Sequence, residues 1–333
     1  MEKVAYISGE TFLYWSSIIL ALAALTAVGV FLSMFLRTKG NGPSAIFLVP
    51  TALILSVLCA RFMHWYCRAD SYASLKAAMT DLSGGGYALM GVFAGCVISA
   101  CVLWVVRLVK DLPQALDCMA LAGAAGIGVG RLAGFFGDGN RGAILKGITE
   151  LPMVSPVVNP VSGAVEYRLA TFLLQAIAAG IIFAILIGFY LLPRKKHPLR
   201  RGDTTLLFLS LYCATQAVLD STRYDSLFMR SNGFVSFVQV LSAVGLLIPV
   251  VVFSVRMVRA MDMRRWFYSL WSLLAAALGG AGYMEYYVQR HGDRAQFAYT
   301  VMSGCLLAVV ALTLLIRSLG IHGKKKPAPP AAQ

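Results

Sequence analysis

Charged residues are scarce in this chain, and their scarcity argues against a soluble globular protein. Only 13% of the 333 residues are charged, whereas 59% are hydrophobic. A soluble protein usually carries about 25% charged residues, which help to cover its surface. Here the apolar residues come in runs of about 20, which is long enough to cross the hydrocarbon core of a bilayer as a helix. We therefore predict a polytopic membrane protein rather than two soluble domains.

Several motifs of soluble enzymes are also missing. None of the seven cysteines belongs to a CxxC pair, and most lie in or beside apolar runs, where a free thiol behaves as a small apolar group. No metal cluster, P-loop or serine-nucleophile motif is visible, so we expect no metal, no cofactor and no disulfide framework. The first ten residues carry one Lys and two Glu and lack the basic start of a signal peptide. The first apolar run is expected to be a retained helix.

The apolar runs predict an all-α bundle of nine transmembrane spans. Each span is expected to be helical because an isolated strand cannot satisfy its backbone in lipid. The predicted spans are Tyr14–Leu36, Ser44–His64, Gly86–Val106, Ala115–Phe136, Arg168–Leu192, Thr204–Thr222, Phe234–Val255, Trp266–Val288 and Gln296–Ile316.

The distribution of basic residues predicts the orientation of the bundle. One set of connecting segments, which includes the C-terminal tail, holds nearly twice as many Lys and Arg residues as the other. Basic residues mark the cytoplasmic side, so we expect the N-terminus outside and the C-terminus inside. Residues 321–333 are predicted to be a disordered basic cytoplasmic tail. Topology and anionic headgroups explain the net charge of +14, and no nucleic-acid-binding module is visible.

Six ionisable residues fall inside or just beyond the predicted spans. They are Arg61, His64, Arg131, Asp138, Asp220 and Arg223. A charge within a membrane helix is costly, so it usually faces a cavity or a partner. The predicted topology places all six at the outer ends of three spans. We interpret them as a cluster in the outer leaflet.

Arg131 gives the strongest indication of a binding site. It stands in the glycine-rich stretch GAAGIGVGRLAGFFGDGNRG, whose glycines alone would indicate close helix packing. Together with Asp138, Arg131 favours a lipid-headgroup or substrate site, because a guanidinium donates two parallel hydrogen bonds to a phosphate. Arg223 alone is equally consistent with an arginine that reaches the headgroups.

Other polar residues near the cluster have simpler interpretations. His64 is consistent with a packed interfacial histidine. Tyr212 and Gln216 lie one turn apart on the sixth span, where both fit ordinary hydrogen bonding between helices.

Four segments resemble bacterial prolipoprotein diacylglyceryl transferase over about residues 15–256. GRLAGFFGDGNRG at Gly130–Gly142 is similar to the family signature GRxGNFxNxExxGR, and YCATQAVLDSTR at Tyr212–Arg223 is similar to YxxxRxxxExxR. VSFVQVLS at Val235–Ser242 resembles ISMGQxLS, and GGYALMG at Gly85–Gly91 resembles GGxSFHGG. Arg61 matches an arginine at the outer end of the second span. The resemblance implies a seven-span membrane domain at residues 1–256 and two additional helices at 257–320.

The chain matches the family pattern at some positions and departs from it at others. Arg131, Tyr212 and Arg223 match, and Asp220 conservatively replaces a glutamate. Met90 stands in place of an important histidine, and Gln216 in place of an arginine proposed to be catalytic. Glycines at positions 134, 137 and 139 replace two asparagines and a glutamate.

The resemblance implies transfer of a diacylglyceryl group from phosphatidylglycerol to the lipobox cysteine of preprolipoproteins, with release of glycerol phosphate. The reaction would take place in the outer leaflet of the bacterial plasma (inner) membrane. The implied phosphate ligands are Arg61, Arg131 and Arg223, and the supporting residues are Asp138, Asp220 and Gln216. Tyr212 is a candidate catalytic residue, and we hypothesise that His64 serves as the general base that forms the thiolate.

Two other functions stay open. A non-catalytic relative would bind phospholipid or a lipoprotein precursor without transferring the lipid. A small-solute transporter is less favoured, because transporters often carry inverted repeats and bind solute near the bilayer midplane. We find no convincing repeat here, and the charges lie at one depth near the outer surface.

Overall fold

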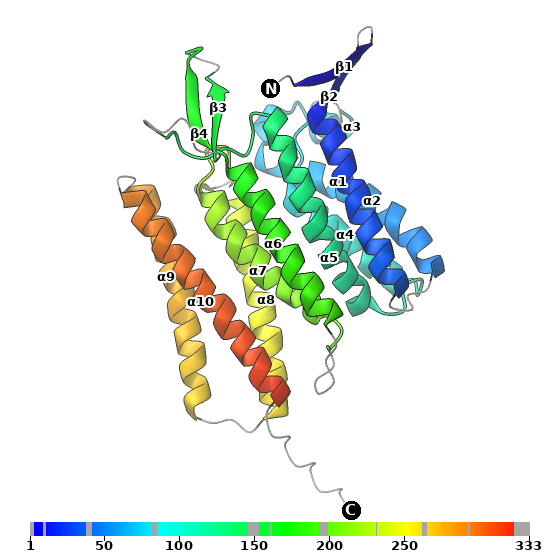
Figure 1. Cartoon of the computed structure of the whole chain (residues 1–333), viewed down its shortest axis with the longest axis vertical. Coiled ribbons are helices and arrows are strands. Elements are labelled where there is room, and N and C mark those ends of the chain that lie inside the picture. Colours follow the sequence, from blue (N-terminus) through cyan, green and yellow to red (C-terminus); the bar gives the residue numbers. More distant parts are fainter. Residues whose placement is uncertain are drawn as a thin grey trace, which may run out of the picture. The chain divides into compact units, whose positions relative to one another are not determined.

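The computed structural model of the chain is predominantly helical (Figure 1). It describes residues 3–8, 11–37, 42–81, 85–145, 153–159, 162–192, 199–230, 232–261, 265–291 and 294–322. The prediction of a disordered basic tail falls almost wholly on residues 323–333, which lie outside the described residues.

The described residues form ten α-helices and two short 3-10 helices. The α-helices are α1 (Trp15–Arg37), α2 (Gly42–Cys67), α3 (Leu75–Thr80), α4 (Leu89–Val105), α5 (Leu112–Arg131), α6 (Thr171–Leu191), α7 (Asp203–Ser221), α8 (Phe237–Ala260), α9 (Arg265–Arg290) and α10 (Ala295–His322). The 3-10 helices are η1 (Ala69–Ser71) and η2 (Leu132–Phe136).

Six of these helical segments are long and apolar enough to cross a membrane, as judged over the described residues. They are α1, α2, α5 with η2, α6, α8 and α10, and α4 is a shorter apolar helix. These segments confirm the prediction of a polytopic helical membrane protein. The count of nine spans and the orientation of the termini stay predictions.

Over the described residues, three short antiparallel hairpins lie outside the long helices, and none of them was predicted. They pair β1 (Val4–Ser8) with β2 (Thr11–Tyr14), β3 (Val154–Val158) with β4 (Val165–Leu169), and β5 (Phe228–Met229) with β6 (Asn232–Ser236). In β3–β4, Val154 pairs with Leu169 and Val158 with Val165. Gly163 in the connection has a φ of 69°, which glycine adopts without strain. This hairpin lies mostly between the predicted spans Ala115–Phe136 and Arg168–Leu192.

The chain divides into two compact units. The first contains the described residues of 1–193, 199–208 and 219–241. In it α1 packs along α5, and α2 along α4 (Figure 1). Gly91 and Gly95 of α4 lie directly against the backbone of α2, at Ala60 and Leu55 respectively, where an added Cβ would have no room. Small residues therefore allow these two helices to approach closely.

The second unit contains the described residues of 209–218 and 242–322. Helices α9 and α10 lie side by side in it (Figure 1). Its apolar core gathers buried residues from α7, α8, α9 and α10, namely Cys213, Ala214, Leu246, Ala281, Met302, Leu306, Val309 and Val310. The proposal that the last two helices are an addition to a seven-span domain stays a prediction.

Candidate functional site

Helix α5 carries Arg131 to the start of a tight glycine-rich turn. The helix begins where the side chain of Asp111 accepts a hydrogen bond from the backbone N–H of Gln114, and it ends at Arg131. After η2 the chain turns sharply, and Asn140 adopts a left-handed φ of 59°. This conformation is tolerated by asparagine better than by most residues. Arg131 Nη1 donates to Asn140 Oδ1 at 2.9 Å, so the turn folds back onto the end of its own helix.

The end of α7 carries a buried carboxylate, Asp220, which is 0% exposed. Its Oδ1 accepts from Arg223 Nη1 at 3.0 Å, and its Oδ2 accepts from the hydroxyl of Ser236. The backbone carbonyl of the same residue accepts from the Ser226 hydroxyl at 2.9 Å. A carboxylate with an ion-pair partner and hydroxyl donors can remain ionised in the protein interior. Asp220 therefore holds the guanidinium of Arg223 in one orientation.

Asp225 joins the end of α5 to the end of α7. Its Oδ1 accepts from Arg223 Nε at 3.0 Å, and its Oδ2 accepts from the backbone N–H of Asn140 at 2.8 Å. These contacts join five residues into one connected set, called here the Arg131–Asp220 network: Arg131, Asn140, Asp225, Arg223 and Asp220. The charge of Arg131 also acts on the Asp220 carboxylate. The structure therefore brings together three of the charged residues that the sequence singled out.

Arg223 keeps a free donor for a ligand. Its side chain is 11% exposed, and its Nε and Nη1 atoms bind the two carboxylates. Its Nη2 makes no hydrogen bond to any described residue. A fixed, partly accessible guanidinium is well suited to bind a phosphate oxygen, because it need not be reordered when the ligand arrives.

Arg141 supports the glycine-rich turn and was not among the predicted site residues. It is 3% exposed. Its Nη2 donates to the carbonyls of Gly134 and Gly137 at 3.1 and 2.7 Å, and its Nη1 donates to the Ser155 hydroxyl. Burial lowers the pKa of its guanidinium, an effect that the nearby Asp138 carboxylate opposes. The sequence signal for this role of Arg141 is its position, because it directly follows Asn140 in the glycine-rich stretch.

Asp138 lies at the surface and pairs away from the network. Its Oδ2 accepts from Lys3 Nζ at 2.5 Å, and the two side chains are 58% and 53% exposed. Its backbone carbonyl accepts from the Tyr224 hydroxyl at 3.2 Å. The supporting role predicted for the carboxylate of Asp138 stays a prediction.

Arg61 is almost fully buried near the end of α2, at 1% exposure. Each of its three nitrogens donates to a backbone carbonyl of the segment that follows, and these carbonyls belong to Ala78, Asp81 and Gly86. Its guanidinium also lies over the rings of Tyr72 and Tyr87. These contacts make Arg61 a support for the segment around α3. Its predicted role as a phosphate ligand stays a prediction.

His64 lies one turn beyond Arg61 and contacts the same segment. Its Nδ1 is 2.8 Å from the Tyr72 hydroxyl. A hydrogen bond at Nδ1 orients the ring and leaves Nε2 as the second functional nitrogen. The role of His64 as the general base stays a prediction.

The end of α2 lies next to the segment that holds Asp220. The rings of Tyr66, on α2, and Phe237, at the start of α8, have centroids 6.0 Å apart. Phe237 directly follows Ser236, whose hydroxyl binds Asp220. The Arg61–His64 pair and the Arg131–Asp220 network therefore share one end of the first unit, and the location of that end in the outer leaflet stays a prediction.

The remaining predicted positions are buried in helices. Met90 is 8% exposed in the first turn of α4, close to Ala60 of α2, whose carbonyl accepts from the Ala88 N–H. Tyr212 and Gln216 are 4% and 3% exposed on the part of α7 that belongs to the second unit. The roles predicted for Tyr212 and Gln216 stay predictions.

The β3–β4 hairpin contacts Tyr224, which follows Arg223, through Arg168, and an ion pair within β4 orients that arginine. Glu166 binds Arg168 at 2.6 Å and accepts a hydrogen bond from Asn159 Nδ2 at 2.6 Å. The Asn159 and Arg168 donors lower the pKa of the Glu166 carboxyl. The Arg168 guanidinium carbon lies 4.3 Å from the centroid of the Tyr224 ring. Tyr224 directly follows Arg223 in the chain. The hairpin thus lies next to the network.

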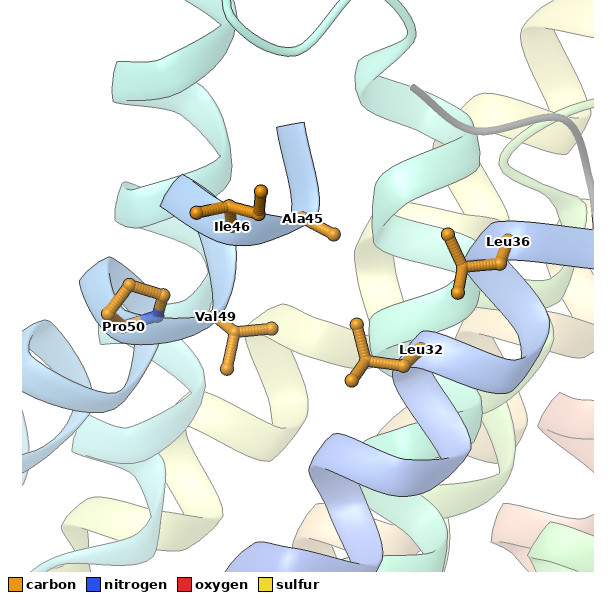
Figure 2. Close-up of a pocket in the computed structure, with 6 residues that line it drawn as sticks. All are labelled: Leu32, Leu36, Ala45, Ile46, Val49 and Pro50. Carbon is orange, nitrogen blue, oxygen red and sulfur yellow. The ribbon is translucent and has the colours of Figure 1, made fainter. Parts of the chain in front are cut away.

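An apolar groove opens at the other end of α1 and α2. Figure 2 shows its lining residues, which are Leu32, Leu36, Ala45, Ile46, Val49 and Pro50. None of these side chains carries a polar or titratable group, so this groove cannot perform acid–base or phosphate chemistry. Among the described residues, no group of His, Cys, Asp or Glu side chains could hold a metal ion.

Comparisons with known proteins identify the family. A family model described as prolipoprotein diacylglyceryl transferase matches residues 3–255, and the chain belongs to this family. Relatives named phosphatidylglycerol–prolipoprotein diacylglyceryl transferase include those of Bacillus licheniformis, 22% identical over 270 residues (80% of this chain and 96% of the relative), and Streptococcus sanguinis, 23% identical over 254 residues (74% and 95%). A relative from Bacillus cereus is 27% identical over 268 residues (77% and 92%). The resemblance inferred from the motifs is confirmed.

Proposed function

We propose that this member of the prolipoprotein diacylglyceryl transferase family moves the diacylglyceryl group of phosphatidylglycerol to the lipobox cysteine of preprolipoproteins. The observation that carries the proposal is the Arg131–Asp220 network. It fixes two guanidinium groups at one end of the first unit through Asn140, Asp225 and Asp220. The names of the relatives supply the donor lipid and the acceptor class.

The proposed reaction is a displacement at the glycerol carbon that carries the phosphate. The cysteine thiol loses its proton to a base, and the thiolate sulfur attacks that carbon. The carbon–oxygen bond breaks, its electron pair goes to the phosphate oxygen, and glycerol phosphate leaves as the thioether forms. Arg131 and the free Nη2 of Arg223 would stabilise the negative charge that develops on the phosphate.

Asp220 and Asp225 act as positioning residues in this proposal. They hold Nη1 and Nε of Arg223, so that Nη2 points to the ligand without losing conformational entropy on binding. We propose His64 as the base that takes the thiol proton, with Tyr72 orienting its ring. Tyr212 is the alternative candidate.

The proposed setting is the outer leaflet of the bacterial plasma membrane, with the N-terminus outside and the C-terminus inside. The acyl chains would lie among the apolar helices, and the headgroup and lipobox peptide would meet at the outer surface. Arginines at the ends of membrane helices suit this depth, because their charge lies near the polar headgroups.

A non-catalytic relative that binds phospholipid or precursor is the second candidate function. Met90 and Gln216 favour it, because they replace a histidine and an arginine of the family pattern. A small-solute transporter is less favoured, since the charged residues gather at one end of the unit.

A transfer assay separates the first two candidates. Purified protein, phosphatidylglycerol and a lipobox peptide should release glycerol phosphate and form a lipidated peptide. Arg131→Ala should abolish the release, whereas Arg37→Ala, at an exposed position at the far end of α1, should leave it unchanged. Lipid binding without any release by the unmodified protein would support the non-catalytic function instead.

A further inference from the structure

Gln175 is a buried glutamine of α6 whose amide has no hydrogen-bond partner among the described residues. The residue is 3% exposed, and both Oε1 and Nε2 are enclosed without a bond. Removing an amide from water without a new partner is unfavourable, so buried amides are nearly always hydrogen-bonded. An amide left unpaired beside a cluster of charged groups points to a ligand.

Gln175 lies on the face of α6 that meets the end of α5. A Cβ at Gly128 would touch α6 at residues 176–180, and a Cβ at Gly134 would overlap the ring of Phe172. Arg131 lies three residues from each of these glycines. The point on α6 opposite Arg131 therefore falls between those two contacts, in the turn that holds Gln175.

Thr171, on the same face of α6, contacts the end of α7. Its hydroxyl lies 3.2 Å from that of Thr222, which stands between Asp220 and Arg223 in the chain. Gln175 is four residues further along the buried face, about 6 Å from Thr171 along the helix axis. It is therefore deeper in the helical unit than the network at the end of α7.

We propose that Gln175 binds an ester carbonyl of the phospholipid whose phosphate is held by Arg131, with Nε2 as the donor. The identity of the lipid rests on the proposed function. In a glycerophospholipid one ester sits on the carbon next to the one that carries the phosphate. A ligand anchored by its phosphate at Arg131 and Arg223 directs its esters and acyl chains toward the membrane interior, where Gln175 lies. The amide then recognises the diacyl part of the donor.

Binding of phosphatidylglycerol and of its diether analogue, which lacks ester carbonyls, tests the proposal on the detergent-solubilised full-length protein. The unmodified protein should bind the diester about fivefold more tightly, the effect of one net hydrogen bond. Gln175→Leu, close in size but without the donor, should bind the two lipids equally. Equal affinities for the unmodified protein, or a preference that survives in Gln175→Leu, would overturn the proposal.

Two further variants separate recognition from folding. Gln289→Leu changes an exposed glutamine of α9 and should keep the preference for the diester. Gln175→Met, which is close in length and has no hydrogen-bond donor, should also lose the preference, and it supplies the comparison if Gln175→Leu fails to fold. If the transferase proposal is wrong, the unmodified protein will not transfer the diacylglyceryl group. Retained transfer without discrimination between the lipids would overturn only the role of Gln175.

Discussion

Asp220 and Arg223 form a pair in which one member is completely buried. When one partner of such a pair is removed, the other charge stays in a medium that solvates it poorly. Asp220 is enclosed, so the free energy of unfolding should fall strongly when Arg223 is removed. It should also fall strongly when Asp220 itself is replaced. Replacing both charges together leaves no unpaired charge in the interior, because the side chain of Asp225, the second partner of Arg223, is 25% exposed.

A double-mutant cycle on this pair should show strong coupling. We expect Asp220→Ala and Arg223→Ala each to reduce the free energy of unfolding by about 3 kcal/mol, and the double variant to lose much less than the sum. Thermal or denaturant unfolding in detergent, followed by circular dichroism, measures each value. Additive losses would contradict the view that these two side chains form one unit.

Arg61 should stabilise the segment around α3 through its backbone contacts. Arg61→Met keeps much of the side-chain volume but leaves three carbonyls without their donor, so we expect a loss of about 2–4 kcal/mol and faster proteolysis between residues 75 and 88. Limited proteolysis followed by mass spectrometry measures the effect. The control Lys76→Met changes an exposed cation of the same segment and should alter neither rate nor stability.

Arg61 and Arg141 show that the hydrogen-bond partners of a buried arginine could not be predicted from the sequence. The sequence indicated that buried arginines need partners, but it could not indicate which partners. Both find backbone carbonyls of segments that fold back on them, and those contacts depend on turns that have no strong local signature. Arg131 and Arg223 each lie at a helix end marked by a motif, and the structure links them through Asn140 and Asp225, whereas their predicted role as phosphate ligands stays a prediction.

At the scale of elements, glycines decide how closely α4 and α2 approach. A Cβ at Gly95 would lie 2.5 Å from backbone atoms of Leu55 and Ser56, so Gly95→Ala should force the helices apart. We expect a loss of about 1–3 kcal/mol in unfolding free energy. Gly180→Ala, at a helical position where no atom lies within 4 Å of the new Cβ, should be neutral or slightly stabilising. Similar losses in both variants would argue against close packing at Gly95.

The β3–β4 hairpin should loosen at low pH. The folded pKa of Glu166 is lowered by Asn159 and Arg168, so its stabilising effect is present above the unfolded pKa of about 4.3 and is lost as the pH falls through the lower folded value. Cleavage of the hairpin by pepsin should therefore accelerate as the pH falls below about 4.3. Glu166→Gln should remove this dependence, whereas an unchanged pH profile in that variant would contradict the assignment.

Elements differed in how well the sequence predicted them. The predicted bounds of α1 differ from the observed ones by one residue at each end, and those of α6 by at most three, because a long apolar run in lipid satisfies its backbone as a helix. The hairpins were missed because their strands are only two to five residues long and follow no clear alternation. In β3–β4, Pro156 and the polar Ser155 further obscure the strand pattern.

At the scale of the whole molecule, the distribution of basic residues predicts that the two termini lie on opposite sides of the membrane. Green fluorescent protein fused to the C-terminus should fluoresce, and alkaline phosphatase fused there should be inactive, because the C-terminus is expected in the cytoplasm. Active alkaline phosphatase at the C-terminus would reverse the orientation. It would also place the Arg131–Asp220 network at the cytoplasmic surface, away from exported precursors.

The central claim is that the Arg131–Asp220 network binds the donor phosphate during diacylglyceryl transfer. The most direct measurement is release of glycerol phosphate from phosphatidylglycerol by the purified protein with a lipobox peptide, compared among the unmodified protein, Arg131→Ala and Arg37→Ala. We predict release with the unmodified protein and Arg37→Ala, and a loss of at least about a hundredfold with Arg131→Ala. Undiminished release by a correctly folded Arg131→Ala protein, or no release by the unmodified protein while it still binds the lipid, would contradict the account.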